Sequence, residues 1–253
     1  MKTLENQTAI ISGALGDIGR AIARELASRG AAAALGDVRP QNDAQPFLDE
    51  LKADGFEARY SQVDVSDADA VTCWVEEVEN TFGVPNLIIP NAAIVTLENI
   101  RSVTPEQWRR ELNINLDGAF HLAQSGALRL LEKQKSGRIV FIGSWAAHAP
   151  HVHLPAYSVA KAGLRMLMKC LALDLAPEDI LVNEVAPGYV DAGLSGKIFN
   201  ENPKLRAEAE AKVPVRRLIS SEEVALEVAH LCEPQTRQTT GSVVLMDGGL
   251  SLL

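Results

Sequence analysis

Short apolar runs alternate along the chain with segments of helical periodicity. The runs predict β-strands at residues 8–12, 31–35, 58–63, 86–90, 138–142, 180–185 and 241–247. The helical patterns lie at residues 18–30, 46–52, 68–81, 104–135, 156–168, 201–212 and 220–232. Strands that alternate with helices in this way form a parallel sheet with helices on both of its faces.

We therefore expect an α/β fold, a Rossmann-type doubly wound seven-stranded parallel sheet, in a single domain that spans residues 1–253. The carboxyl ends of its strands lie along one edge, because crossovers between parallel strands are right-handed. Ligands bind at that edge, in the crevice where the strand order reverses. Residues that follow the strands are the first candidates for a functional site.

The composition excludes several classes of protein. A hydrophobic content of 47% over 253 residues suits one large domain with a full core. A net charge of −9 and the lack of a basic stripe argue against nucleic-acid binding. No apolar stretch reaches the length of a membrane span and no signal-peptide pattern begins the chain, so we expect a cytoplasmic protein. The three cysteines lie in apolar helical patterns, which predicts buried, reduced thiols.

A glycine-rich turn, Ser12-Gly13-Ala14-Leu15-Gly16-Asp17-Ile18-Gly19, joins the first strand to the first helix. Its glycines allow a pyrophosphate to approach the N–H groups of a helix N-terminus closely. About twenty residues further on, Asp37 ends the second strand, where a carboxylate accepts the ribose hydroxyls of NAD and repels the 2′-phosphate of NADP. Arg39 is a candidate phosphate partner. The alternative for Asp37 is an ordinary solvated acid at a strand end.

Tyr157 and Lys161 share one face of the predicted helix after Pro155. A cation beside a phenol favours the phenolate and lowers its pKa, so the pair can pass a proton to or from an alcohol oxygen. Ser144 follows the strand at 138–142, where its hydroxyl can bond the same oxygen. Taken alone, a tyrosine and a lysine at this spacing are more often a surface pair, so the rest of the chain must decide.

With these motifs in this order, nearly the whole chain resembles the short-chain dehydrogenase/reductase family. The first turn is similar to the family's Thr-Gly-x-x-x-Gly-x-Gly, except that Asp17 stands at the middle glycine. Pro90-Asn91-Ala92-Ala93 resembles the Asn-Asn-Ala-Gly turn of the family, altered at both ends. Ala192 replaces a frequent threonine and so removes one hydroxyl contact.

The resemblance implies a nicotinamide dinucleotide held by the turns that follow the strands, and Asp37 favours NAD over NADP. In the family, the acidic-apolar pair after the third strand contacts adenine, and the turns after the fourth and sixth strands contact the nicotinamide end. The residues implied are Gly13, Leu15, Asp17, Ile18, Gly19, Asp37, Asp64, Val65, Asn91, Ala92, Tyr157, Lys161, Pro187, Gly188 and Val190.

The resemblance also implies a catalytic tetrad of Asn115, Ser144, Tyr157 and Lys161. In the direction of oxidation, Tyr157 takes the alcohol proton while the carbon gives a hydride to the nicotinamide. Ser144 fixes the substrate oxygen, and Lys161 lowers the pKa of Tyr157 and binds ribose hydroxyls. Asn115 holds a water of the proton relay. No metal is needed for this chemistry.

Residues that follow the catalytic serine, with one from the sixth strand, are candidates for substrate recognition. A tryptophan ring suits the C–H face of a sugar or polyol, although core packing explains it equally well. The histidines of this segment lie in an irregular loop, which argues against a metal site, and they also fit plain loop residues. In this family residues 193–214 form a lid over the substrate. The candidate contacts are Ser144, Trp145, His151, His153, Tyr157 and Glu184, the last of which could instead face a neighbouring helix.

We therefore expect an NAD-dependent dehydrogenase that acts on a small polar alcohol or ketone, with a sugar or polyol as the favoured class. The alternatives are a carbonyl or 3-oxoacyl reductase, which usually prefers NADPH, and a dinucleotide-sensing protein without turnover, which typically lacks the tyrosine or the lysine. No nucleic-acid or membrane partner is expected. The family commonly forms homotetramers, and the apolar runs 164–175 and 250–253 fit buried interfaces.

Overall fold

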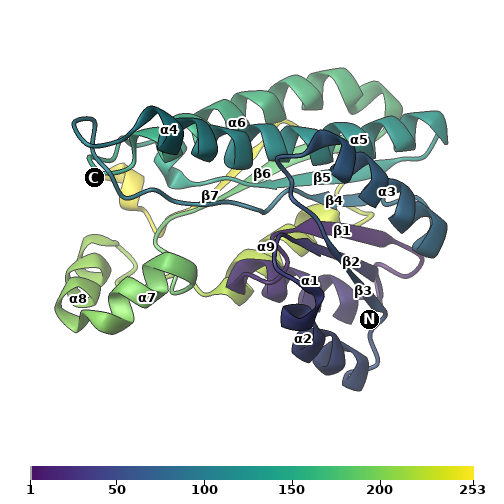
Figure 1. Cartoon of the computed structure of the whole chain (residues 1–253), viewed down its shortest axis with the longest axis horizontal. Helices are drawn as coiled ribbons and strands as arrows, with labels where there is room; N and C mark the ends of the chain where they lie inside the picture. Colours follow the sequence, from purple (N-terminus) through teal and green to yellow (C-terminus); the bar gives the residue numbers. More distant parts are fainter. Residues whose placement is uncertain (1) are drawn as a thin grey trace.

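The computed structural model describes residues 2–253, apart from the side chains of residues 194, 197 and 198. Its centre is a seven-stranded sheet with the order β3-β2-β1-β4-β5-β6-β7, and every neighbouring pair of strands is parallel (Figure 1). The strands are β1 (Thr8–Ser12), β2 (Ala32–Asp37), β3 (Ala58–Gln62), β4 (Leu87–Ile89), β5 (Gly137–Ile142), β6 (Ile180–Pro187) and β7 (Val243–Met246). The predicted seven-stranded, doubly wound parallel sheet is confirmed.

Helices cover both faces of this sheet (Figure 1). One face packs against α1 (Asp17–Ser28), α2 (Gln41–Ala53) and α9 (Ser221–Cys232). The other packs against α3 (Ala68–Phe82), α5 (Gly118–Glu132) and α6 (Pro155–Leu175). Successive strand residues supply the two cores in turn: Ile11 belongs to the first and Ile10 to the second. Strands buried on both faces explain why the apolar runs are continuous rather than alternating.

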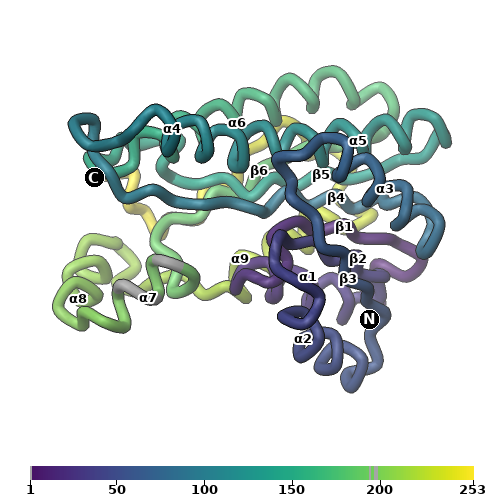
Figure 2. The backbone as a smooth tube through the Cα atoms, viewed as in Figure 1, coloured from purple at the N-terminus to yellow at the C-terminus, as the bar shows by residue number. Residues whose placement is uncertain are grey.

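Three further helices stand around the carboxyl edge of the sheet. The helix α4 (Pro105–Leu112) begins at a Thr104 capping box and continues through a π-helical turn, η1 (Asn113–Asp117), into α5. The helices α7 (Gly193–Glu201) and α8 (Pro203–Lys212) project beside the sheet, away from both helical layers (Figures 1 and 2). None of the helices described is long and apolar enough to cross a membrane.

The strand order reverses between β1 and β4, and a side chain joins the two strand ends. The hydroxyl of Ser12 accepts the N–H groups of Asn91, at 3.0 Å, and Ala92, at 3.1 Å. The Asn91 amide in turn donates to the carbonyl of Ser12 at 2.9 Å. The crevice expected at the switch point therefore has a fixed inner wall.

Four local expectations were wrong. The single helical pattern at 104–135 is interrupted by η1, and α7 was not predicted at all. The helix α2 begins at Gln41, upstream of Pro46, which lies inside it. Cys73 and Cys170 are exposed and only Cys232 is buried among the cysteines, because the apolar patterns of α3 and α6 extend around to their outer faces.

Candidate active site

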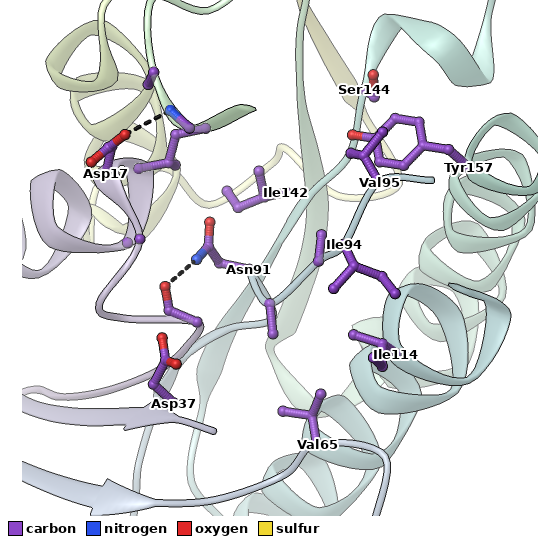
Figure 3. A pocket seen from close by; sticks show the side chains of 18 of the residues that line it. Asp17, Asp37, Val65, Asn91, Ile94, Val95, Ile114, Ile142, Ser144 and Tyr157 are labelled. Atoms are coloured by element: carbon purple, nitrogen blue, oxygen red, sulfur yellow. Dashed lines mark hydrogen bonds between the residues drawn. The ribbon is translucent and has the colours of Figure 1, made fainter. Parts of the chain in front are cut away.

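A cleft of about 570 Å³ opens at the carboxyl edge, over the point where the strand order reverses. Most of the residues expected to hold a dinucleotide line it (Figure 3). They come from the turns after five different strands and from the helix α6, so only the folded chain brings them together. They are Gly13, Asp17, Ile18, Gly19, Asp37, Asp64, Val65, Asn91, Ala92, Tyr157, Lys161, Pro187, Gly188 and Val190.

The turn between β1 and α1 is too tight for side chains at its first and last glycines. Gly13 has a φ of +61°, and a Cβ there would lie 2.7 Å from the Cα of Ala92. A Cβ on Gly19 would lie 2.3 Å from the Gly13 carbonyl oxygen. The main chain of this turn is therefore exposed to the cleft at the N-terminus of α1, where N–H groups bind phosphate.

Asp37 lies in the cleft with both carboxylate oxygens engaged. One accepts the N–H of Leu15 at 3.1 Å, and the other is 3.2 Å from Nε of Arg39. The side chain of Leu15 itself belongs to the core, so its main chain is the part that meets the site. Arg39 also donates its main-chain N–H to Oδ1 at 3.2 Å and Nη2 to Oδ2 at 3.4 Å, so each oxygen already has two donors. Ribose hydroxyls would therefore have to replace the long contacts of the Arg39 guanidinium.

Asp17, the departure from the glycine pattern, reaches across the cleft to α7. Its Oδ2 accepts the N–H of Gly193 at 2.6 Å, and Figure 3 shows the carboxylate turned toward this donor. A carboxylate in the first turn of α1 also lies where a helix N-terminus attracts anions. Asp17 thus links the glycine turn directly to the segment expected to act as a lid.

The π-turn η1 turns Asn115 inward. Its side chain is 1% exposed, donates to the carbonyl of Ile94 at 2.8 Å and accepts the N–H of Ile94 at 2.8 Å. A π-turn holds one residue more than an α-turn and is common at functional sites. Asn115 is buried behind the cleft and pins the segment that forms its wall.

Ser144, Tyr157 and Lys161 meet at the inner end of the cleft. Ser144 ends the segment after β5 at 7% exposure, and its hydroxyl lies on the same side of the cleft as the phenol of Tyr157 (Figure 3). The Lys161 ammonium lies 5.6 Å from the centroid of the Tyr157 ring and donates to the Ile142 carbonyl at 2.8 Å. The spacing within α6 therefore does bring phenol and amine to one face.

Burial dominates the pKa values of this group. It lowers the pKa of Lys161 to about 8, although the negative charges of Glu184 and Glu111 act in the opposite direction. It raises the pKa of Tyr157, where a hydrogen bond from Ser144 acts against the rise and the charge of Glu111 adds to it. We expected the ammonium to lower the pKa of the phenol. That expectation was wrong for the free protein, because burial has the largest effect on the phenol and raises its pKa.

The residues expected to contact substrate are divided. Ser144 and Tyr157 line the cleft, but Trp145 packs edge-on against His151, with ring centroids 4.4 Å apart, and against Tyr189 at 5.3 Å. The ring of His151 donates from Nδ1 to the Ala149 carbonyl at 2.7 Å. His153 is exposed on the loop before α6. No cluster of potential metal ligands occurs among the residues described.

Glu184 does not face the cleft. It is fully buried under Gly143, where an added Cβ would lie 2.0 Å from its Oε1. The guanidinium of Arg165 donates to Oε1 at 2.9 Å and to Oε2 at 3.0 Å, and also to the Ser144 carbonyl at 3.2 Å. This placement corrects the expectation of a substrate contact: Glu184 supports the segment that carries Ser144.

Several cleft residues were not singled out from the sequence. They lie beside recognised motifs, and that proximity was the one signal that could have found them. One more, Glu111, lies behind the cleft with 0% exposure, one helical turn before Asn115. Glu111 could have been noticed from the sequence because it places a carboxylate on the inward face of an amphipathic helix. The missed cleft residues are Val38, Ile94, Val95, Arg110, Ile114, Ile142, Gly143 and Ser195.

The comparisons with known proteins agree with this geometry. A family profile described as enoyl-(acyl carrier protein) reductase matches residues 13–251. The chain belongs to the short-chain dehydrogenase/reductase family. As members of this family are oxidoreductases that act on CH–OH groups, so is this chain, and nicotinamide dinucleotides are the typical cofactors.

Relatives within the short-chain dehydrogenase/reductase family differ in substrate. The 3-oxoacyl-(acyl-carrier-protein) reductase FabG of Escherichia coli is 31% identical over 249 residues, which cover 98% of this chain and 99% of FabG. A tropinone reductase homolog of Arabidopsis thaliana is 34% identical over 251 residues, covering 99% and 92%. The crystal structure of a gluconate 5-dehydrogenase from Burkholderia cenocepacia, in complex with NADP and tartrate, matches with a TM-score of 0.93 at 25% identity, covering 100% and 98%.

Proposed function

We propose that this chain is an NAD-dependent dehydrogenase that interconverts a secondary alcohol and a ketone, with a sugar or polyol as the favoured substrate. The observation that carries the proposal is the convergence of Asp37, Ser144, Tyr157 and Lys161 on one cleft. Asp37 lies at the end where the family binds adenosine, and the other three lie at the inner end. The site thus combines a ribose acceptor with a proton-transfer group.

The cleft fits a dinucleotide at its phosphate-binding turn. Side chains are excluded at Gly13 and Gly19, which leaves main-chain N–H groups at the start of α1 to meet a pyrophosphate. Val65 and Ile114 offer apolar contact for adenine, and Pro187 and Val190 line the cleft beyond β6. When bound, nicotinamide supplies the hydride acceptor or donor.

The residues of the chain manage the proton and the substrate oxygen. Tyr157 keeps its proton at neutral pH, because burial raises its pKa, so it is ready to protonate a ketone oxygen. The Ser144 hydroxyl lies beside it and can bond the same oxygen. Alcohol oxidation needs Tyr157 to accept a proton, and we expect that direction to accelerate as the pH rises above neutral.

The choice of NAD depends on Asp37. Its carboxylate repels a 2′-phosphate, while the guanidinium of Arg39, which also lines the cleft, would attract one. The two groups form an ion pair, with Nε and Oδ1 3.2 Å apart, so Arg39 is already engaged. We infer a preference for NAD on the balance of these charges.

The test is a substrate panel measured by the change in NADH absorbance. We expect oxidation of at least one sugar, sugar acid or polyol, with kcat/KM at least about ten-fold higher for NAD than for NADP. Asp37→Ala should reduce this ratio, and Asp43→Ala, which removes an acid from α2 outside the cleft, is the matched control. Activity on none of these alcohols, or a preference for NADP, would contradict the proposal.

A second candidate, 3-oxoacyl thioester reduction, is favoured by the 31% identity to FabG over nearly the full length. The same panel distinguishes the two, because that reaction would consume NADPH with a 3-oxoacyl thioester and leave polyols untouched. If neither panel gave turnover while a dinucleotide bound tightly, the sensing alternative would gain support.

A further inference from the structure

Glu111 is a buried carboxylate that the mechanism above does not use. It is the buried residue of α4, with 0% exposure, and α4 packs against α6, the helix of Tyr157 and Lys161. Its two oxygens accept the N–H of Thr96 at 3.3 and 3.2 Å. Thr96 follows Ile94 and Val95, which line the cleft. Glu111 therefore lies directly behind the wall of the active site.

The two buried glutamates of this region differ in their partners. Glu184 on β6 is neutralised by Arg165, whose Nη2 lies 2.9 Å from Oε1. Glu111 has no such neighbour: among the residues that the structure describes, no lysine or arginine nitrogen lies within 4.0 Å of its carboxylate. Arg109 and Arg110, beside it in sequence, are both exposed, and Arg110 lines the cleft.

Lys161 is the complementary unpaired charge. It is 2% exposed, and its ammonium donates to the carbonyl of Ile142 rather than to an acid. The negative charges that act on it are Glu184 from β6 and Glu111 from α4, and the Tyr157 ring of its own helix lies 5.6 Å away. Of the two acids Glu184 has the larger effect on Lys161, but Glu184 is paired with Arg165, whereas Glu111 is the acid without a paired cation among the described residues.

We propose that Glu111 is an unpaired buried counter-charge that helps to keep Lys161 protonated while the enzyme works. This makes Glu111 a positioning residue, which acts through Lys161 and through the cleft wall at Thr96. The inference rests on the role of Lys161 in the proposed function, but not on the identity of the substrate.

The charge matters because Lys161 titrates close to working conditions. Its pKa of about 8 already reflects support from Glu111, and removal of that charge lowers the value further. Glu111 also raises the pKa of Tyr157. Loss of its charge should therefore move both titrations in the same direction, toward lower pH. A residue that only anchored Thr96 would change stability without displacing either titration.

The experiment compares Glu111→Gln with Glu111→Asp and wild type. NADH affinity, followed by fluorescence between about pH 6 and pH 10, should fall as Lys161 loses its proton, and Lys161→Met should remove that dependence. We expect Glu111→Gln to displace the midpoint by about one unit toward lower pH. Glu111→Asp keeps the charge and should keep the midpoint. Glu106→Gln, on the exposed face of α4, is the matched control.

A double-mutant cycle on thermal stability repeats the test without any ligand. Glu111→Gln, Lys161→Met and the double variant should show a coupling of a few degrees at pH 7 that disappears above the pKa of Lys161. An unchanged midpoint in Glu111→Gln, or a coupling absent at pH 7, would overturn the proposal and leave Glu111 as an anchor for Thr96. Absence of turnover on sugars or polyols would overturn the proposed substrate but would leave both readouts intact.

Discussion

The floor of the cleft, formed by Ser144, Tyr157 and Lys161 with Asn115 behind them, differs from the helix α8. Asn115, Ser144 and Lys161 are 1%, 7% and 2% exposed, whereas most residues of α8 are exposed. The floor is held by main-chain anchors, such as the carbonyl of Ile142 for Lys161. The helices α7 and α8 are held by surface ion pairs, such as Arg206 with Asp191, and by a small core around Phe199.

This contrast explains why relatives with different substrates share the fold of this chain. The side chains of the floor are fixed by strand ends and buried hydrogen bonds, so replacing one of them disturbs the others. The reaction class is therefore conserved while the substrate varies. Exposed helices that rest on a few contacts can change their side chains at little cost in stability. We therefore expect the floor to determine the chemistry and the segment 193–214 to determine the substrate.

The largest expected effect comes from removing the proton donor of the floor. Tyr157→Phe should lower kcat about a thousand-fold, because no other hydroxyl can replace the phenol, while NADH affinity changes less than about three-fold. Steady-state kinetics and a fluorescence titration measure the two. If Tyr157→Phe retained most of its activity, the floor would not be the site of proton transfer.

Lys161→Met tests whether burying the ammonium of Lys161 in the floor destabilises the folded protein. Activity should fall at least about a hundred-fold. The pKa of Lys161 is lowered from 10.5 to about 8, so the folded state is penalised fully below pH 8 and not at all above 10.5. The variant should therefore melt higher than wild type at pH 7, and the difference should shrink as the pH rises toward 10.5. A lower melting temperature at pH 7 would show that the ammonium stabilises the fold.

Asp17→Gly tests the contact that joins the two regions. The change removes the bond to Gly193 and a negative charge from the phosphate-binding turn. We expect NADH to bind about five-fold more tightly, since a pyrophosphate no longer meets a carboxylate there. Asp17→Asn, which keeps an acceptor for Gly193 without the charge, separates the two contributions. Weaker binding in both variants would mean that Asp17 assists the cofactor.

The smallest effect is expected in α8. Arg206→Ala removes exposed ion pairs with Asp191 and Glu210 and should shift the melting temperature by no more than about two degrees. Arg165→Ala is the matched change in the floor, and there the buried Glu184 is left unpaired, at a cost of about 3 kcal/mol. Differential scanning fluorimetry compares the two. Equal losses of stability would refute the contrast between floor and lid.

The inner strands were predicted well because β1, β4, β5, β6 and most of β2 are buried on both faces and therefore form continuous apolar runs in the sequence. The run at residues 8–12 coincides with β1, and the others differ from the observed strands by a few residues. The helix α7 was not predicted from the sequence because Gly193 and Gly196 lower its helical propensity. The π-turn η1 was not predicted because one extra residue in a helical turn leaves the apolar pattern nearly unchanged.

More of the residues expected to bind the cofactor or act in catalysis line the cleft than of the side chains expected to contact substrate. Glycine turns and strand-end acids depend on local geometry and strand order, which the pattern specifies. The direction of Trp145 or Glu184 depends on what lies opposite, namely Tyr189 and Arg165, and these partners are distant in sequence. The role proposed for Glu111 could not be predicted for the same reason, since it depends on Lys161, which lies on another helix.

The continuous path from α4 through η1 to α5 makes chain length critical at this one place. A single deletion among residues 113–117 would restore regular α-helical winding and rotate everything upstream by about 100° relative to α5. Glu111 and Asn115 could not then both keep their present hydrogen bonds to Thr96 and Ile94. Insertions and deletions should be far less tolerated in this turn than in the exposed turn at residues 100–102 before α4, and a library of length variants would measure the difference.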